Sequence, residues 1–139
     1  MSSAEQLFVK ILKDNQASVT LPRRMVFRLL QKHGLITMSQ LIALAESDVD
    51  TASVYRTIDL FEHLGIVQKI YTGWKYKLEL SEAFMPHHHH AICKKCGAVI
   101  AIQENKDLEN IIQQLAAQAG LTNQTHTLEI RGVCEKCKK

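Results

Sequence analysis

The chain has 139 residues, of which 46% are hydrophobic and 22% charged, which is typical of one soluble domain or two small ones. Its formal net charge of +3 permits an anionic partner without requiring one. No stretch reaches the ~18 consecutive apolar residues of a membrane span, and the N-terminus lacks the pattern of a signal peptide, so we expect a cytoplasmic protein.

Four helices are predicted in the first half of the chain, because apolar residues recur there at helical spacing between capping residues and stops. Thr20 stands at an N-cap with Pro22 in the first turn, and Thr37 caps a third, short helix. The expected segments are Ser3 to Lys13, Thr20 to Gly34, Thr37 to the break at Glu46, and Asp50 or Thr51 to Gly65. The residues expected to face inward are Leu7, Phe8, Ile11, Leu12, Met25, Val26, Leu29, Leu30, Leu41, Ile42, Leu44, Val54, Ile58, Phe61 and Leu64.

A β-hairpin is predicted after the fourth helix, with strands over Ile66–Tyr71 and Trp74–Leu80 and a turn at Thr72–Gly73. Helices followed by a hairpin are the element order of a winged helix, whose last helix enters the major groove of DNA. Tyr55 and Arg56 lie on the outer face of that helix. A basic stripe of Arg24, Arg28 and Lys32 is more often a solvated face than a phosphate contact.

A second, smaller unit is predicted after Met85–Pro86. It comprises a strand over Ala98–Ile102, a helix over Asp107–Ala119 and a strand over Thr125–Val133. The residues expected to face inward from its helix are Leu108, Ile111, Ile112 and Leu115. About fifty residues make a small core, so we expect a bound metal and a second copy of the chain to stabilise this unit.

All four cysteines occur in two C-x-x-C pairs, Cys93 with Cys96 and Cys134 with Cys137. Two such pairs supply the four thiolates of a closed tetrahedral zinc site. A redox dithiol is the alternative, but that role requires one pair that follows a strand and opens a helix. Cys96 leads instead into an apolar run, so structural zinc is favoured.

Four consecutive histidines, His87 to His90, directly precede the first cysteine pair. In an extended segment alternate side chains point to opposite sides, so His87 and His89 would face one way and His88 and His90 the other. This alternation favours two metal sites rather than one. His126 lies on the apolar face of the last predicted strand, where a lone histidine is more often a core residue, but the two nearby histidines favour a ligand.

Four blocks of the sequence resemble the ferric uptake regulator (Fur) family, in the order of that family and over essentially the whole chain. The blocks are Thr20–Arg23, Ala52–Asp59, His87–Gly97 and His126–Cys134. The resemblance implies an α+β protein that acts as a dimeric, metal-dependent repressor. Its residues 1–84 would form a winged-helix DNA-binding domain and residues 85–139 a dimerisation domain with a four-cysteine zinc. It also implies that Thr20, Arg23, Tyr55 and Arg56 meet operator DNA.

The same resemblance implies two further metal sites. One would be formed by His87, His89, Glu109 and His126. The other, a regulatory site between the domains, would be formed by Glu79, His88 and His90, with His33 as a further candidate. A carboxylate such as Glu79 favours Fe(II) or Mn(II), whereas a thiolate would favour zinc. The sequence leaves Fe(II) and Zn(II) open as the regulatory metal, with Mn(II) as a third candidate.

Two other classes of function compete with a regulator. An enzyme would require an open metal position or a placed nucleophile and base, and a zinc closed by four cysteines offers neither. A zinc-containing module that binds nucleic acid or protein without sensing metal would leave His87–His90, His126 and Glu79 without a role. The sequence therefore favours a metal-responsive regulator that is not an enzyme.

Overall fold

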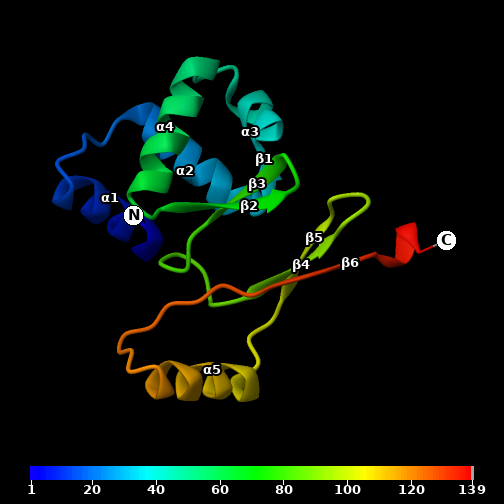
Figure 1. Cartoon of the computed structure of the whole chain (residues 1–139). Coiled ribbons are helices and arrows are strands. Elements are labelled where there is room, and N and C mark those ends of the chain that lie inside the picture. Colours follow the sequence, from blue (N-terminus) through cyan, green and yellow to red (C-terminus); the bar gives the residue numbers. More distant parts are fainter. Residues whose placement is uncertain (139) are drawn as a thin grey trace. The chain divides into compact units, whose positions relative to one another are not determined.

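The computed structural model describes residues 1–138 of the chain, which form two compact units. The first unit covers Met1–Pro86 and holds helices α1 to α4 with a small sheet, whereas the second begins at His87 and holds three strands and helix α5 (Figure 1). None of the helices in this described part is long and apolar enough to cross a membrane.

The helices of the first unit begin at side chains that cap them. They are α1 (Ser3–Asp14), α2 (Leu21–His33), α3 (Met38–Ala45) and α4 (Thr51–His63). The caps predicted at Thr20 and Thr37 are confirmed, since each side-chain oxygen accepts a backbone N–H three residues on. Thr37 and Gln40 form a complete capping box. Asp50 is the cap of α4, and Gly65, at a φ of +73°, follows its end.

The core of the first unit is apolar and aromatic. Phe8 of α1 stacks on Phe27 of α2 with ring centroids 4.4 Å apart, and it meets Phe61 of α4 edge-on at 5.5 Å. Phe27 was not among the predicted inward residues. The prediction that Leu44 faces inward was wrong. The buried residues of α3 are Met38, Leu41 and Ala45, whereas Leu44, which directly precedes Ala45, is exposed.

Arg28 is engaged within the first unit. Its Nε lies 2.6 Å from Glu5 Oε1, and this ion pair joins α2 to α1. The guanidinium in the middle of the basic stripe therefore serves the packing of two helices.

A three-stranded antiparallel sheet completes this unit, in the order β1 (Ile36–Thr37), β3 (Lys75–Leu80), β2 (Val67–Thr72). The predicted hairpin is present, but its turn is made by Gly73 and Trp74, since Thr72 pairs with Lys75. Strand β1 was not predicted, because two residues carry no recognisable period.

The second unit contains a sheet in the order β5–β4–β6, where β4 pairs antiparallel with β5 and parallel with β6. Its elements are β4 (His89–Cys93), β5 (Val99–Ile102), α5 (Lys106–Gln118), β6 (Glu129–Gly132) and a short 3-10 helix, η1 (Glu135–Cys137). The strand predicted from Thr125 is shorter than expected, and His126 precedes it. Ile111 and Leu115 are more than half exposed, so the expectation that they face inward within the chain was wrong.

Candidate metal centres and nucleic-acid interface

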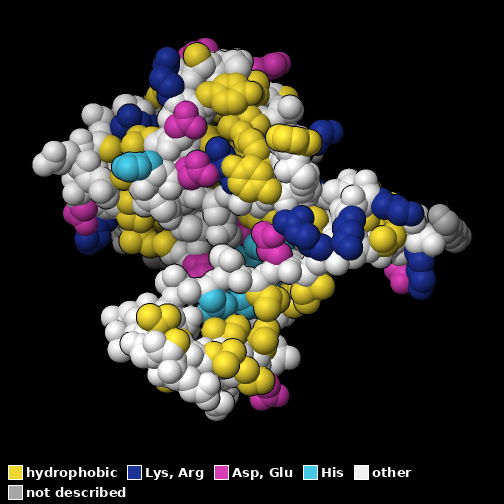
Figure 2. Space-filling view, viewed as in Figure 1, with side chains coloured by type: hydrophobic (Ala, Val, Ile, Leu, Met, Phe, Trp, Pro, Cys, Tyr) yellow, Lys and Arg dark blue, Asp and Glu magenta, His cyan; other side chains and the backbone are white. Residues whose placement is uncertain are grey.

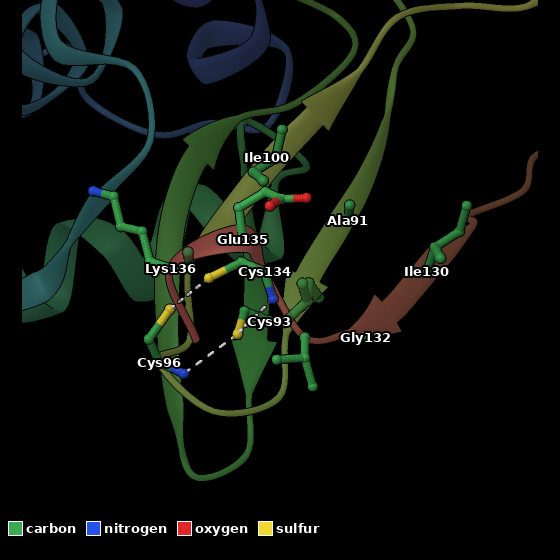
Figure 3. Close-up of a pocket in the computed structure, with 12 residues that line it drawn as sticks. Ala91, Cys93, Cys96, Ile100, Ile130, Gly132, Cys134, Glu135 and Lys136 are labelled. Carbon is green, nitrogen blue, oxygen red and sulfur yellow. Dashed lines mark hydrogen bonds between the residues drawn. The ribbon is translucent and has the colours of Figure 1, made fainter. Parts of the chain in front are cut away.

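The four cysteines converge on one point of the second unit. Cys93 ends β4, and Cys96 follows in the turn to β5. Cys134 directly precedes η1 and Cys137 is its last residue, at the other end of the unit's sequence. All four ligand atoms lie within 4.8 Å of one another, and the Sγ atoms of Cys96 and Cys134 are 3.7 Å apart. In a tetrahedron with Zn–S bonds of ~2.3 Å the sulfur atoms are ~3.8 Å apart, so this cluster fits zinc. Figure 3 shows the sulfur atoms of Cys93, Cys96 and Cys134 directed toward one another.

Hydrogen bonds to Cys93 favour its thiolate. Its Sγ accepts the backbone N–H groups of Lys95, Cys96 and Cys134 at 3.4–3.5 Å. These bonds, that from Cys96 first, lower the pKa of Cys93 to about 6. The neighbouring thiols Cys134 and Cys96 raise the pKa of Cys137 to about 12. Four sulfurs this close therefore ionise together only if a cation neutralises them, as a bound zinc ion would.

The cysteine cluster borders an open, largely apolar cavity of about 690 Å³ on the sheet. Ala91, Ile100 and Ile130 line it from β4, β5 and β6, one residue from each strand (Figure 3). Ile100 and Ile130 are each more than half exposed. One side of the second unit's sheet is therefore apolar and exposed among the described residues of that unit.

A second cluster joins three histidines to one carboxylate. Oε1 of Glu109 lies 2.8 Å from Nε2 of both His87 and His89, and Oε2 lies 2.7 Å from Nε2 of His126. The Nε2 atoms of His87 and His126 are 3.1 Å apart. Glu109 comes from the first turn of α5, whereas the histidines come from β4, the residues just before it and the segment before β6. The structure thus brings together all four residues of this predicted set.

The geometry of this second cluster suits a single metal ion. Donors that each lie ~2.1 Å from one ion at right angles are ~3.0 Å apart, close to the separations observed. Burial opposes the charge of Glu109, but the hydrogen bond from His89 and the nearby His87 and His126 hold its pKa below the usual value. Gln124 Oε1 lies 2.9 Å from His126 Nδ1 and orients this ring from behind, a supporting role that sequence reasoning missed.

His88 and His90 lie on the opposite side of the extended segment from His87 and His89. Their ring centroids are 4.7 Å apart, and those of His87 and His89 are 4.6 Å apart, so the predicted alternation of sides is present. Their proposed co-ligands lie in the first unit. Glu79 is on β3, where Gln68 Nε2 donates to its Oε1 at 2.6 Å, and His33 is the last residue of α2. The regulatory set across the two units stays a prediction.

Three of the four predicted DNA-binding residues, Thr20, Arg23 and Arg56, lie together at the beginnings of α2 and α4. A cavity of about 200 Å³ opens there, lined by Thr20, Pro22, Arg23, Ser53, Arg56 and Thr57. Arg56 Nη2 donates to Ser53 Oγ at 3.1 Å, and Ser53 Oγ lies 2.6 Å from Asp50 Oδ1. Two guanidinium groups and two helix N-termini around one cavity favour an anion such as a phosphate. Ser53 was missed, although its spacing from Asp50 and Arg56 places all three on one side of the helix.

Tyr55 directly precedes Arg56 in the chain, but its side chain does not line this cavity. Its side chain is about half exposed on α4. Its phenol ring is therefore accessible to a partner of this helix.

Known proteins resemble the chain over most of its length. Residues 14–131 match the model of a family described as the Ferric uptake regulator family. A ferric uptake regulation protein of Legionella pneumophila is 35% identical over 137 residues, covering 91% of this chain and 96% of that protein. The structure of the ferric uptake regulator of Vibrio cholerae is 30% identical, with a TM-score of 0.71 and coverage of 90% and 98%. A zinc uptake regulator in complex with zinc and DNA is 28% identical, with a TM-score of 0.56 and coverage of 99% and 96%.

Proposed function

Because this chain belongs to the ferric uptake regulator family, we propose that it is a metal-dependent, DNA-binding transcriptional repressor of metal-homeostasis genes. It acts as a homodimer in the cytoplasm and is not an enzyme. Residues 1–84 form the DNA-binding domain, and residues 85–139 form the domain that binds metal and dimerises.

The four cysteines hold the structural metal, which is zinc. The separations among the sulfur atoms support this assignment, and so does the closed set of four donors, which leaves no position for a substrate. The zinc fixes the end of β4 to the end of the chain. Its contribution is to the stability of the dimerisation domain.

Metal sensing belongs to the histidine sets, and one observation supports this role above the others. The extended segment that ends at Cys93 directs His87 and His89 to one side and His88 and His90 to the other, so one short segment serves both sets. His87 and His89 bind one ion with Glu109 and His126. His88 and His90 bind the regulatory ion with Glu79, and His33 is a further candidate ligand. The regulatory ion is Fe(II) or Zn(II), with Mn(II) as a third candidate.

The regulatory ion acts through the difference in its affinity for two arrangements of the domains. An ion that prefers the DNA-binding arrangement by roughly 100-fold shifts the equilibrium by ~2.7 kcal/mol. A metal shared by Glu79 and His90 would fix the angle between the domains and hence the spacing of the two α4 helices in the dimer. By linkage, operator DNA tightens metal binding by the same factor.

DNA binding belongs to α4 and the start of α2. Tyr55, exposed on α4, packs on a thymine methyl group in the major groove, and Arg56 bonds a guanine or a phosphate. Thr20 and Arg23 hold a backbone phosphate at the cavity between the two helices. The exposed apolar residues of the second unit, including Ile100, Leu115 and Ile130, are covered by the second copy.

The deciding experiment measures metal content and DNA binding together. Metal-depleted protein that retains its zinc is titrated with Fe(II), Mn(II), Zn(II) or Ni(II) while binding to duplexes selected from a random library is followed. We expect one tightly held zinc per chain and an exchangeable metal that is required for tight, sequence-selective binding. One zinc per chain with metal-independent binding would instead indicate a zinc-containing module that senses nothing.

A further inference from the structure

The tip of the β2–β3 hairpin presents the only tryptophan of the chain. Gly73 and Trp74 form the two-residue turn, and Gly73 has a φ of +69°, in the left-handed region. Glycine at the first turn position, followed by a residue with negative φ, matches a type II′ turn, whose twist suits a hairpin. The Trp74 side chain is fully exposed, at 102% of its reference area. The backbone of the turn therefore directs a large apolar ring into solvent.

Lysines and tyrosines precede and follow Trp74 along the two strands of the hairpin. Residues 69–77 contain three lysines, Lys69, Lys75 and Lys77, and no acidic residue. The rings of Tyr71 and Tyr76, paired across the hairpin, have centroids 5.7 Å apart, and Tyr71 is about half exposed. Lysines interleaved with aromatic rings are the chemistry of surfaces that bind nucleic acids, where the cations meet phosphates and the rings pack on sugars or bases.

The hairpin is attached to the helix that carries Tyr55. Lys69 Nζ lies 3.3 Å from Glu62 Oε1 of α4 and 4.7 Å from the centroid of the Tyr76 ring. Ser81, just after β3, donates from Oγ to the carbonyl oxygen of Gly65 at 2.6 Å. Figure 2 shows large hydrophobic side chains on the same face of the first unit as α4 and the hairpin. The hairpin and α4 thus belong to one compact unit and contact each other directly.

We propose that Trp74 packs its indole into the minor groove of the operator, next to the major-groove segment that α4 contacts, with Lys75 and Lys77 on the flanking phosphates. This inference rests on the proposed DNA-binding function and adds a second contact to it. The major groove, ~12 Å wide, admits a helix, whereas the minor groove, ~6 Å wide, admits a flat side chain. Apolar side chains placed there contact deoxyribose and widen or kink the groove, most readily at flexible pyrimidine–purine steps such as TA.

The proposed contact predicts a preference for base pairs that lack a 2-amino group in the minor groove. A G·C pair places its 2-amino group in the minor groove, where it obstructs a flat ring, whereas an A·T pair does not. Inosine lacks this amino group, so an I·C pair keeps the major-groove edge of G·C and removes the obstruction. Wild-type protein should therefore bind a duplex with flanking I·C pairs more tightly than one with G·C pairs.

The test uses the metal-loaded full-length dimer and a duplex selected for tight binding. Trp74 is the only tryptophan, so its fluorescence reports this position alone. We expect the operator to shield the indole from acrylamide. Trp74→Ala should weaken DNA binding about tenfold or more and abolish the difference in affinity between duplexes with I·C and G·C flanks. Trp74→Phe should retain most of the affinity and most of this difference.

Lysine variants test the flanking phosphate contacts. Lys75→Ala should reduce the slope of log affinity against log salt concentration by about one. The control Lys106→Ala, at the start of α5 in the second unit, should leave this slope unchanged. An indole that stays open to acrylamide in the complex, or a Trp74→Ala variant with wild-type affinity and flank preference, overturns the proposed contact. In that case Tyr55→Ala would still weaken binding if the proposed function is correct. Wild-type protein that binds no duplex with any metal overturns the proposed function itself.

Discussion

Cys96 and Cys134 bring their Sγ atoms within 3.7 Å of each other although they lie 38 positions apart in the chain. The intervening segment contains β5, α5 and β6, so the cysteine cluster closes the second unit at its two ends. The second unit is small, and its helix α5 has no buried residue, so its core alone contributes little stability. The cysteine cluster therefore supplies much of the stability of this unit.

Replacing one cysteine should therefore remove the zinc and the dimer together. Structural zinc contributes ~10 kcal/mol in isolated zinc fingers, far more than a small core supplies. Cys134→Ser should lose the stoichiometric zinc measured by atomic absorption and sediment as a monomer or aggregate. Glu135→Ala, a change at the neighbouring position, should keep both properties. A dimeric Cys134→Ser protein with full zinc content would exclude a four-cysteine site.

The carboxylate of Glu109 should determine whether the second cluster binds an ion. Glu109→Gln keeps the size of the side chain but removes the charge that three histidines face. We expect the exchangeable metal of this site to bind at least tenfold more weakly, while zinc content stays at one per chain. Glu104→Gln, which changes an exposed acid before the helix, is the control. Equal metal affinity in both variants would show that the cluster binds no ion.

Tyr55 and Arg23 should affect DNA binding in different ways. Tyr55→Ala removes a ring that contacts base edges. It should therefore reduce the difference in binding free energy between selected and random duplexes by about 1–3 kcal/mol. Arg23→Ala removes a phosphate contact, so it should weaken binding to all sequences alike and flatten the salt slope by about one. Fluorescence anisotropy at several salt concentrations measures both effects. Unchanged binding in both variants would argue against α4 as the recognition helix.

Metal responsiveness should depend on His90. The variant His90→Ala should remain a zinc-containing dimer whose weak DNA binding no longer increases with added metal. Circular dichroism and zinc content serve as controls for folding. If this variant kept the metal dependence of the wild type, sensing would belong to His87, His89, Glu109 and His126 instead.

The cap of α4 should make the stability of the first unit depend on pH. Hydrogen bonds from the Ser53 hydroxyl and backbone N–H lower the pKa of Asp50 below its usual value. The ionised cap therefore stabilises the folded state above pH ~4 and ceases to do so as the pH falls through the lowered folded-state pKa. Asp50→Ala should reduce the free energy of unfolding at pH 7, with a difference from wild type that shrinks in acid. Asp50→Asn should lose less, and denaturant titrations at several pH values compare the three proteins.

Local signals in the sequence were sufficient for the helices of the first unit. Thr20 and Thr37 cap helices because their hydroxyl groups accept hydrogen bonds from the backbone N–H groups three residues on. This interaction is local and does not depend on the tertiary fold. Leu44 was misplaced because a short helix leaves the direction of its stripe uncertain by one residue. The turn at Gly73–Trp74 shifted by one position for a similar reason, since only the pairing of Thr72 with Lys75 fixes the register.

The candidate sites depended on long-range contacts to different degrees. The cysteine pairs were recognisable because each C-x-x-C is local, and the alternation of His87 to His90 follows from an extended backbone. Gln124 behind His126 was not foreseen, because its supporting hydrogen bond has no required spacing. Ser53 beside Arg56 was overlooked although its spacing from Asp50 and Arg56 indicates a common side of α4. Ile111 and Leu115 have the spacing of core residues, but a chain alone does not distinguish a core from an interface.

The extended segment that carries the histidines, His87 to β4, also limits how this protein can change in evolution. Deletion of Ala91 would move each histidine one place along β4 while Cys93 held the far end, because β4 is paired on both sides. Pro86 would then occupy the place of His87, and His90 would enter the position of Ala91 on the same side as His89. Point substitutions in this segment alter one ligand at a time, whereas an insertion or deletion of one residue reassigns the ligands of two metal sites at once.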